Sequence, residues 1–188
     1  MTVRLHLGCG SRDFGPTWDH IDGGDYPHLK SKDILKLPYE DNSVDLIYAS
    51  HVLEYFDREE VKTVLAEWFR VLREGGTLRV AVPDFTRLSC LYCDGDVHLD
   101  QVLGPLFGRM KMGDVTIYHK TVYDRPSLAN VLHEAGFHFI RDYNWRNTDH
   151  THFDDCSCAH LPHNEQAIKT HNFDDSYTLI SLNVEATK

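Results

Sequence analysis

The chain has 188 residues, with 29 acidic and 19 basic side chains, so its formal net charge is -10. A chain of this length fits one domain and can bury a hydrophobic core without disulfides or metal. The negative charge disfavours nucleic-acid partners, because a phosphate backbone repels an acidic surface that lacks a Lys/Arg cluster. No apolar run reaches the length of about 18 residues that a membrane-spanning helix needs, so we expect no membrane span.

The beginning of the sequence and its cysteines predict a cellular compartment. The first ten residues lead straight into an apolar strand pattern and lack the basic and apolar regions of a signal peptide, so we expect a cytoplasmic protein. The five cysteines are an odd number, and in that compartment we expect them to be reduced thiols.

Four strands are predicted in the first quarter of the chain. They are expected over residues 3–7, 18–22, 29–34 and 44–49. The strand signal over 29–34 is the weakest of the four. Gly8-Cys9-Gly10 ends the first strand, because two glycines in three residues favour a tight turn.

The best helix signal follows the fourth strand. Asp57 and Glu60 have the spacing of a capping box, and apolar residues recur at helical spacing from Val61 to Leu72. Gly75-Gly76 is expected to stop this helix. The later elements are expected to be a strand over 77–82, a helix from Asp84 to Cys93, a helix over 127–135, and strands over 137–145 and 177–185. Residues 94–118 are expected to be irregular, and 146–176 loop-like.

The alternation of strands and helices predicts an α/β fold with a doubly wound, mostly parallel sheet and helices on both faces. No helix separates the last two strands, so we expect an antiparallel terminal strand. Residues 11–17 are fewer than the about twelve that a parallel crossover takes, so the first crossover helix is expected to be reduced to a turn. We expect a single domain over 1–188, with lid or substrate-side insertions at 94–125 and 146–176.

The end of the first strand is the candidate ligand site. Ligands of open α/β sheets bind beyond the carboxyl ends of the strands, and Gly8 and Gly10 let the backbone approach a ligand closely. A dinucleotide site would need a third glycine where this chain has Asp13, whose carboxylate would repel a pyrophosphate. A cationic sulfonium cofactor tolerates nearby carboxylates. Asp22 and Asp33 end the next two strands, where they can accept hydrogen bonds from ribose hydroxyls and from an adenine amino group.

Several segments together resemble the class I S-adenosylmethionine-dependent methyltransferases, and the resemblance covers residues 3 to about 85 well. The matching segments are 5–10, 33–45, 50–54, 68–76 and 78–83, with a later helix at 124–137 and a tail at 181–185 similar to a subgroup of predicted methyltransferases. The resemblance implies a Rossmann-like methyltransferase fold, S-adenosylmethionine as cofactor, and an enzyme that transfers its methyl group.

The resemblance also implies cofactor contacts by position. The turn at 8–10 would line the methionine moiety, Asp22 would hold the ribose, residues 33–34 would face the adenine, and residues 50–51 would lie beside cofactor and acceptor. The cofactor-binding residues implied in this way are Leu7, Gly8, Cys9, Gly10, Asp22, Asp33, Ile34, Ser50 and His51.

His51 and Glu54 are the candidate catalytic residues. His51 directly follows the fourth strand, and its imidazole can titrate near neutral pH, so it can act as a base; the alternative is a histidine that bonds the adjacent loop backbone. Glu54 lies three residues on and can orient this imidazole, or can simply belong to the first helical turn. His119 and Tyr123 lie before the last helix, where they either reach the site or pack and face solvent.

The His- and Cys-rich segment near residue 156 allows a metal-binding alternative. It contains Cys156, Cys158, His160 and His163, to which Cys90 and Cys93 could add. We expect no metal, because C-x-C is not the usual zinc spacing and the C-x-x-C pair falls on a predicted helix. Residues 146–163 are instead expected to form a substrate-side loop. Its polar contacts to a hydroxylated substrate would come from His150, His152, Asp154 and Asp155.

The sequence therefore predicts methyl transfer from S-adenosylmethionine to a small-molecule or sugar-like acceptor, with no nucleic-acid or membrane partner. The oligomeric state stays open. Three alternatives remain: a catalytically inactive, methyltransferase-like binding module, a nucleotide-using oxidoreductase, and a zinc-dependent structural protein.

Overall fold

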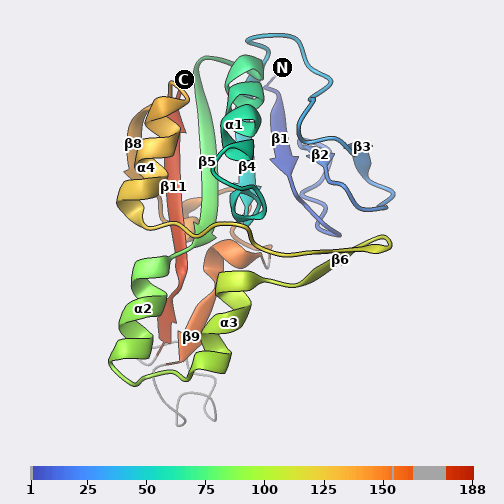
Figure 1. The fold of residues 1–188 in the computed structure, drawn as a ribbon. Helices are drawn as coiled ribbons and strands as arrows, with labels where there is room; N and C mark the ends of the chain where they lie inside the picture. Colours follow the sequence, from blue (N-terminus) through green and yellow to red (C-terminus); the bar gives the residue numbers. More distant parts are fainter. Residues whose placement is uncertain (1, 154, 163–176) are drawn as a thin grey trace.

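A computed structural model describes residues 2–153, 155–162 and 177–188, and its centre is a seven-stranded sheet (Figure 1). The strand order is β3-β2-β1-β4-β5-β11-β8. These strands are β1 Arg4–Leu7, β2 Asp19–Ile21, β3 Leu29–Ser31, β4 Val44–Ser50, β5 Leu72–Pro83, β8 His138–Asp142 and β11 Ser181–Thr187. β1 to β5 pair in parallel, whereas β11 pairs antiparallel with both β5 and β8. The expected α/β fold with an antiparallel terminal strand is confirmed.

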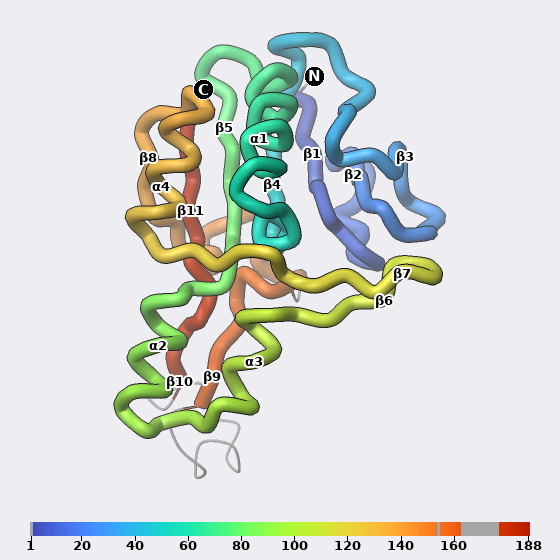
Figure 2. Tube along the Cα trace, in the orientation of Figure 1, coloured from blue at the N-terminus to red at the C-terminus, as the bar shows by residue number. Residues whose placement is uncertain are grey.

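The remaining elements surround this sheet. The helices are α1 Glu60–Val71, α2 Phe85–Cys93, α3 Leu99–Phe107 and α4 Arg125–Glu134, with short 3-10 turns η1 Leu53–Tyr55, η2 Trp145–Asn147 and η3 Cys156–Cys158. Two small antiparallel pairs join β6 Met110–Met112 to β7 Val115–Ile117, and β9 His160–Pro162 to β10 Tyr177–Leu179. In Figures 1 and 2, α2, α3, β9 and β10 lie together below the carboxyl end of β5.

One face of the sheet packs against α1 and α4, which lie side by side in front of it (Figure 1). Apolar residues of α1 recur every three or four positions, so they form one buried stripe. The buried members of this stripe are Val61, Val64, Leu65, Trp68 and Val71. They pack with the alternate strand residues Leu5, Leu7 and Ile47 in one continuous core, which holds α1 against the face of the sheet.

The opposite face of the sheet carries aromatic and histidine side chains. His6 and Tyr48 point to this face and contact Phe14, Trp18 and His150 from the segments that follow β1 and β8. Residues 8–18 contain no helix, so the reduced first crossover is confirmed. The expectation of helices on both faces differs from the structure here, because loops with large flat side chains cover this face over the described residues.

Several predicted boundaries were wrong. α1 ends at Val71, four residues before Gly75, because Leu72 is already extended and begins β5. Residues 94–118 were expected to be irregular but contain α3, β6 and β7, and the predicted final strand consists of β10 and β11. The capping prediction was correct in its contacts: Asp57 Oδ1 accepts from the Glu60 backbone N–H, and Glu60 Oε2 accepts from the Asp57 backbone N–H, both at 2.9 Å.

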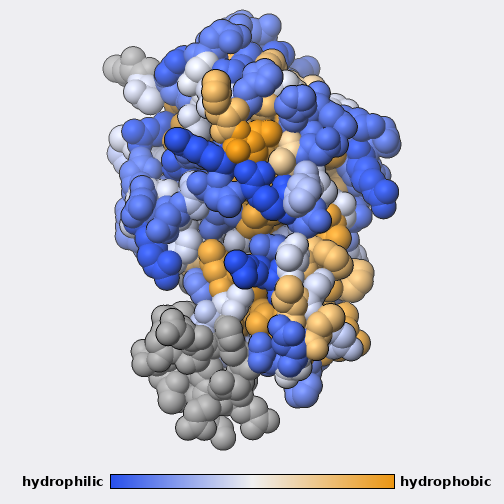
Figure 3. Space-filling model, turned by 90° about the vertical axis from the view of Figure 1, so that its left-hand side faces the viewer, coloured by the Kyte–Doolittle hydropathy of each residue, from blue (hydrophilic) through white to orange (hydrophobic). Residues whose placement is uncertain are grey.

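The molecular surface seen in Figure 3 is largely hydrophilic, with apolar side chains gathering in the lower right of that view. Exposed apolar side chains include Leu99, Leu103 and Phe107, which follow one face of α3. No helix among the described residues is long and apolar enough to cross a membrane.

Candidate cofactor site and catalytic cluster

The turn after β1 takes a conformation that requires glycine. Gly8 and Gly10 have φ values of +66° and +57°, in the left-handed region that other residues rarely adopt. A Cβ on Gly8 would lie 2.3 Å from Cγ2 of Val52, so the glycine also allows a close approach of two segments. The Gly8 N–H donates to the carbonyl of Ile21 at 2.8 Å, which holds the turn against the end of β2.

Asp22 ties the glycine turn to the loop after β2. Its Oδ2 accepts from the Gly10 N–H at 2.8 Å, and its Oδ1 accepts from the Gly24 N–H at 2.7 Å. Each carboxylate oxygen can accept a further hydrogen bond, so Asp22 can hold the turn and bind ligand hydroxyls at the same time.

A cavity of about 530 Å³ opens at this edge of the sheet. This volume is in the range that binds small organic molecules. Four predicted cofactor residues line it: Gly8, Asp22, Ile34 and His51. The other lining residues are Gly23, Val52, Tyr55, Phe56, Met110, Met112, Thr116, Ile117, Tyr118 and Lys120.

The other predicted cofactor residues do not line this cavity. Leu7 and Cys9 are fully buried, and burial, followed by the charge of Asp22, raises the pKa of the Cys9 thiol to about 12. The exposed Asp33 uses its Oδ1 to accept from the N–H groups of Leu35 and Lys36, at 2.8 and 3.1 Å. These bonds shape the turn that carries Ile34. Gly10 is also outside the lining and donates its N–H to Asp22. Ser50 has its Oγ 3.5 Å from Oδ1 of Asp155 and points to the aromatic face.

One wall of the cavity is the β6–β7 hairpin, which the sequence analysis did not predict. It extends beneath the ends of β1 and β2 in Figure 2 and contributes Met110, Met112 and Ile117 to the lining. A Cβ on Gly23 would lie 2.5 Å from Sδ of Met112, so the hairpin packs tightly on the loop after β2. A signal was present, because a two-residue Gly113-Asp114 connection between short β-type runs is typical of a hairpin.

His51 and Glu54 are in contact beside the cavity. Nδ1 of His51 lies 3.2 Å from Oε1 of Glu54, and Nε2 of His51 lies 3.1 Å from Oγ of Ser181. The Glu54 side chain is fully buried, and His119 approaches the same Oε1 with its Nε2 at 3.9 Å. His51 has φ +55°, a conformation uncommon for a residue with a side chain, so the surrounding structure must hold this position.

The buried charge of Glu54 affects two tyrosines nearby. Burial is the main cause that raises the pKa of Tyr55 and of Tyr123 to about 12, and the Glu54 carboxylate adds to the rise in both. Both phenols therefore stay protonated at neutral pH. They cannot serve as bases there, which leaves the imidazoles and Glu54 as the proton-accepting groups of this cluster.

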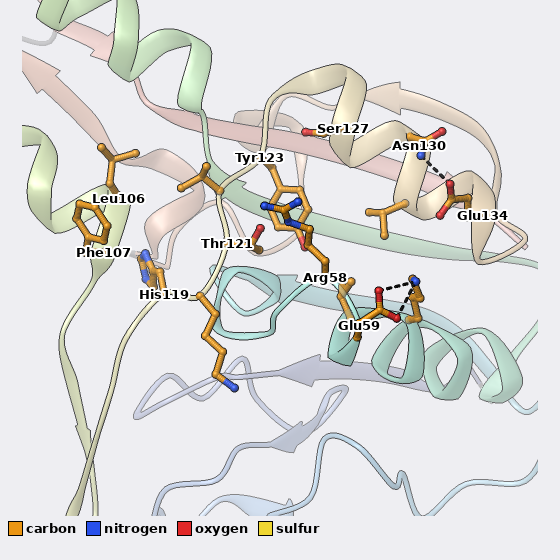
Figure 4. Close-up of a pocket in the computed structure, with 15 residues that line it drawn as sticks. Arg58, Glu59, Leu106, Phe107, His119, Thr121, Tyr123, Ser127, Asn130 and Glu134 are labelled. Carbon is orange, nitrogen blue, oxygen red and sulfur yellow. Dashed lines mark hydrogen bonds and ion pairs between the residues drawn. The ribbon is translucent and has the colours of Figure 1, made fainter.

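A second cavity of about 710 Å³ lies between α1, α4 and the segment 118–123 (Figure 4). Figure 4 shows His119 at one end beside Phe107 and Leu106, and Tyr123 in the centre. Lys120 lines both this cavity and the first one, so the two cavities adjoin at the segment that carries His119.

Residues 146–162, which were expected to contact substrate, pack on Phe14 in the loop after the glycine turn. Two of their polar side chains are buried and make contacts within the fold. His150 and Asp155 are buried; His150 stacks on Phe14, and Asp155 accepts a hydrogen bond from the Tyr48 hydroxyl at 2.6 Å. His152 is exposed, whereas Asp154 and His163 lie outside the described residues. All five cysteines are free, and over the described ranges no three His, Cys, Asp or Glu side chains gather in a metal-binding arrangement.

Comparisons with known proteins agree with this architecture. Residues 18–80 match the family model described as a methyltransferase domain. A comparison with curated protein sequences finds no match. Among solved structures, an S-adenosylmethionine-dependent methyltransferase from Archaeoglobus fulgidus is 14% identical with a TM-score of 0.58, over 100% of this chain and 86% of that chain.

Two further structures have the same fold. A Burkholderia thailandensis 1,6-didemethyltoxoflavin-N1-methyltransferase with bound 1,6-didemethyltoxoflavin and S-adenosylhomocysteine is 14% identical, with a TM-score of 0.56 over 99% of this chain and 70% of that chain. A complex between the Haloferax volcanii Trm112 methyltransferase activator and a methyltransferase gives 17% identity and a TM-score of 0.56, over 99% and 81%.

Residues 18–80 are therefore similar to a methyltransferase domain, and the chain has the fold of S-adenosylmethionine-dependent methyltransferases. Both findings agree with the resemblance seen in the sequence.

Proposed function

We propose that the cavity of about 530 Å³ holds S-adenosylmethionine and that the chain transfers the methyl group to a small-molecule or sugar-like acceptor. The observation that carries the proposal is the convergence of Gly8, Asp22, Ile34 and His51 on one cavity at the carboxyl ends of β1, β2 and β4. These residues come from four separate segments, so their meeting is a property of the fold.

Each segment has a role in holding the cofactor. Asp22 accepts hydrogen bonds from the ribose hydroxyls, and Ile34 packs against the adenine ring. The backbone of Gly8 and Gly10 passes the methionine moiety without a side chain in the way. Among the residues outside the lining, Asp33 acts through the turn that places Ile34. Leu7, Cys9 and Ser50 support the strand ends from behind.

S-adenosylmethionine supplies the electrophilic methyl group, so this chain has to align the acceptor and take up a proton. His51 lines the cavity and Glu54 contacts its imidazole, so this pair is the candidate proton acceptor. Because Glu54 is buried and lies 3.2 Å from Nδ1, it fixes the orientation of the imidazole. The insertion 94–125, whose hairpin roofs the cavity, acts as a lid that keeps water out.

The acceptor is a small molecule in this proposal. The net charge of -10 argues against a polyanionic acceptor, and the Burkholderia relative of similar fold binds a small aromatic compound. The cavity of about 710 Å³ adjoins the cofactor cavity and offers room for such an acceptor. Its lining combines apolar side chains such as Val131 and Phe107 with the polar groups of Thr121 and Asn130.

A methyltransferase-like binding module is the second candidate. The reduced first crossover favours it, because residues 8–18 contain no helix to support the glycine turn. Turnover distinguishes the two candidates: formation of S-adenosylhomocysteine with any member of a panel of hydroxylated and aromatic small molecules supports an enzyme. Cofactor binding without turnover on the whole panel supports a binding module.

Calorimetric titration with S-adenosylmethionine and with S-adenosylhomocysteine tests the cofactor site. We expect saturable binding to the wild type and affinity about tenfold weaker in Asp22→Asn, since a ribose hydroxyl loses a charged acceptor. Asp25→Asn is the matched control, because Asp25 is exposed in the same loop and pairs with Lys32. No binding of either compound by the wild type would overturn the proposal, and an equal loss in both variants would remove Asp22 from the site.

A further inference from the structure

Three titratable side chains meet at one buried oxygen. Oε1 of Glu54 lies 3.2 Å from Nδ1 of His51 and 3.9 Å from Nε2 of His119. The Glu54 side chain has no exposed surface, and over the described residues neither carboxylate oxygen has a hydrogen-bond donor other than these imidazoles. A buried carboxylate without a donor is costly, so Glu54 depends on the two imidazoles for its polar contacts.

A chain of hydrogen bonds fixes the protonated nitrogen of His51. The side-chain N–H of Asn183 donates to the Ser157 carbonyl at 2.8 Å, which turns its Oδ1 toward Ser181. The Ser181 hydroxyl donates to that Oδ1 at 3.0 Å. The Ser181 oxygen is then an acceptor for His51 Nε2 at 3.1 Å, so Nε2 carries a hydrogen and Nδ1 faces Glu54.

A backbone carbonyl fixes the other tautomer in His119, with the hydrogen on Nδ1. Nδ1 of His119 lies 3.0 Å from the carbonyl oxygen of Pro105, which can only accept, so Nδ1 carries the hydrogen. Nε2 of His119 is left facing Glu54. The ring fits because Gly108 has no side chain, since a Cβ there would lie 2.5 Å from Nε2. The ring of His119 also forms a T-shaped pair with the ring of Tyr55, with the two centroids 4.7 Å apart.

We propose that Ser181, Asn183 and the carbonyl of Pro105 are positioning groups that make His51, Glu54 and His119 one proton-holding unit. At rest, one proton lies between Nδ1 of His51 and Oε1 of Glu54. Nε2 of His119 keeps a lone pair without a hydrogen-bond partner at 3.9 Å from the carboxylate, and it is the nitrogen that takes a second proton.

This inference rests on the proposed function and gives the released proton a path. During transfer, a bond forms between the acceptor atom and the methyl carbon, the bond from sulfur to that carbon breaks, and the acceptor loses its proton. His51 lines the cofactor cavity, whereas His119 lines the cavity of about 710 Å³. Both nitrogens of His51 are engaged at rest, so the proton of the acceptor goes to Nε2 of His119, beside the cavity that offers room for the acceptor, and Glu54 balances the charge of that imidazolium.

The test is the tautomer of each histidine, read by long-range proton–nitrogen NMR on the full chain labelled with 15N-histidine. His51→Gln and His119→Gln assign the two sets of signals. We expect Nε2 of His51 and Nδ1 of His119 to be the protonated nitrogens in the wild type. A neutral His51 that carries its hydrogen on Nδ1 would overturn the proposal.

Ser181→Ala tests the positioning role, with Ser89→Ala on α2 as the matched control. We expect the His51 signals to move to an exchange average of both tautomers in Ser181→Ala, and to stay unchanged in Ser89→Ala. Unchanged His51 signals in Ser181→Ala would remove Ser181 from the unit. Titration with S-adenosylhomocysteine separates the cofactor site from the proton-holding unit. We expect Ser181→Ala to bind this compound within about twofold of the wild type. Absence of binding to the wild type would reject the cofactor site alone.

Discussion

At the scale of single residues, the shape of the proposed cofactor cavity depends on Gly8. Its φ of +66° and the distance of 2.3 Å from a Cβ to Val52 are two separate reasons why no other residue fits. The left-handed conformation by itself costs a side chain about 1 kcal/mol, whereas a clash with a buried valine forces the turn to move. The position of the turn is therefore set by the packing of η1 on the end of β1.

Gly8→Ala is expected to weaken S-adenosylhomocysteine binding by at least about tenfold and to destabilise the fold by about 2 kcal/mol or more, because strain and overpacking add. Calorimetry and thermal unfolding measure the two effects. Gly10→Ala is the matched control: it has a similar φ of +57°, but its Cβ would meet only the flexible end of Arg12 at 3.8 Å. Equal losses in both variants would show that the contact with Val52 is irrelevant.

Local patterns predicted individual site residues where a strand end alone determines their place. Gly8, Asp22, Ile34 and His51 each follow a strand, and the carboxyl ends of parallel strands meet at one edge, so their convergence could be predicted. Asp33 shows the limit of such reasoning, because an exposed Asp in a turn can satisfy its own backbone instead of a ligand.

At the scale of elements, the β6–β7 hairpin forms one wall of the cavity. Thr116 and Tyr118 of the same segment also line the cavity, while Val115 is 63% exposed and does not. Met112 of this hairpin meets the opposite wall closely, at Gly23. The flexible thioether can adapt its shape to a bound ligand.

Met112→Ala is expected to weaken S-adenosylhomocysteine binding about fivefold, since roughly 1 kcal/mol of apolar contact is lost. Val115→Ala removes apolar area from the other side of the same hairpin and is expected to leave binding unchanged. Calorimetric titration of the two variants gives the comparison. Equal affinities would mean that the hairpin does not close over the ligand.

Whether an element could be predicted depended on how local its determinants are. Capping contacts such as those of Asp57 and Glu60 act within one turn, so the start of α1 was visible in the sequence. The end of α1 was not, because Leu72 leaves the helix to pair with Val44 in a neighbouring strand. β6 and β7 are three residues each and stand away from the main sheet, so their short patterns were overlooked.

At the scale of the whole molecule, buried histidines replace a helix layer on the second face of the sheet. Burial is the main cause that lowers the pKa of His150 to about 4, and it holds the pKa of His6 well below its usual value, with further lowering by His20. Both rings are almost fully buried among Phe14 and Tyr48, so the folded state keeps them neutral.

The free energy of unfolding should therefore fall in acid. An unfolded His150 gains its proton below about pH 6.5, but the folded one does so only near pH 4. The stability that the neutral ring contributes is complete above pH 6.5 and is lost as the pH falls from 6.5 to 4, by about 3 kcal/mol for this residue. Urea unfolding at pH 7 and pH 4.5 measures the loss.

His150→Phe keeps a flat ring in the stack and removes the titration, so we expect a smaller acid loss than in the wild type. His152→Phe is the control, since His152 is exposed two residues away. If the wild type and His150→Phe lose the same stability between the two pH values, the buried ring is not responsible.

The strand order also constrains how the chain can assemble. β11 follows β8 in the chain, yet it lies between β5 and β8 and pairs with both. The strands cannot pair in the order in which they are synthesised. β8 can join the main sheet only after β11, Ser181–Thr187, has paired with β5. Until that late insertion, the nascent protein presents two unsatisfied strand edges. It is then most prone to mispair with another copy, and contacts so distant in sequence make the closing step slow.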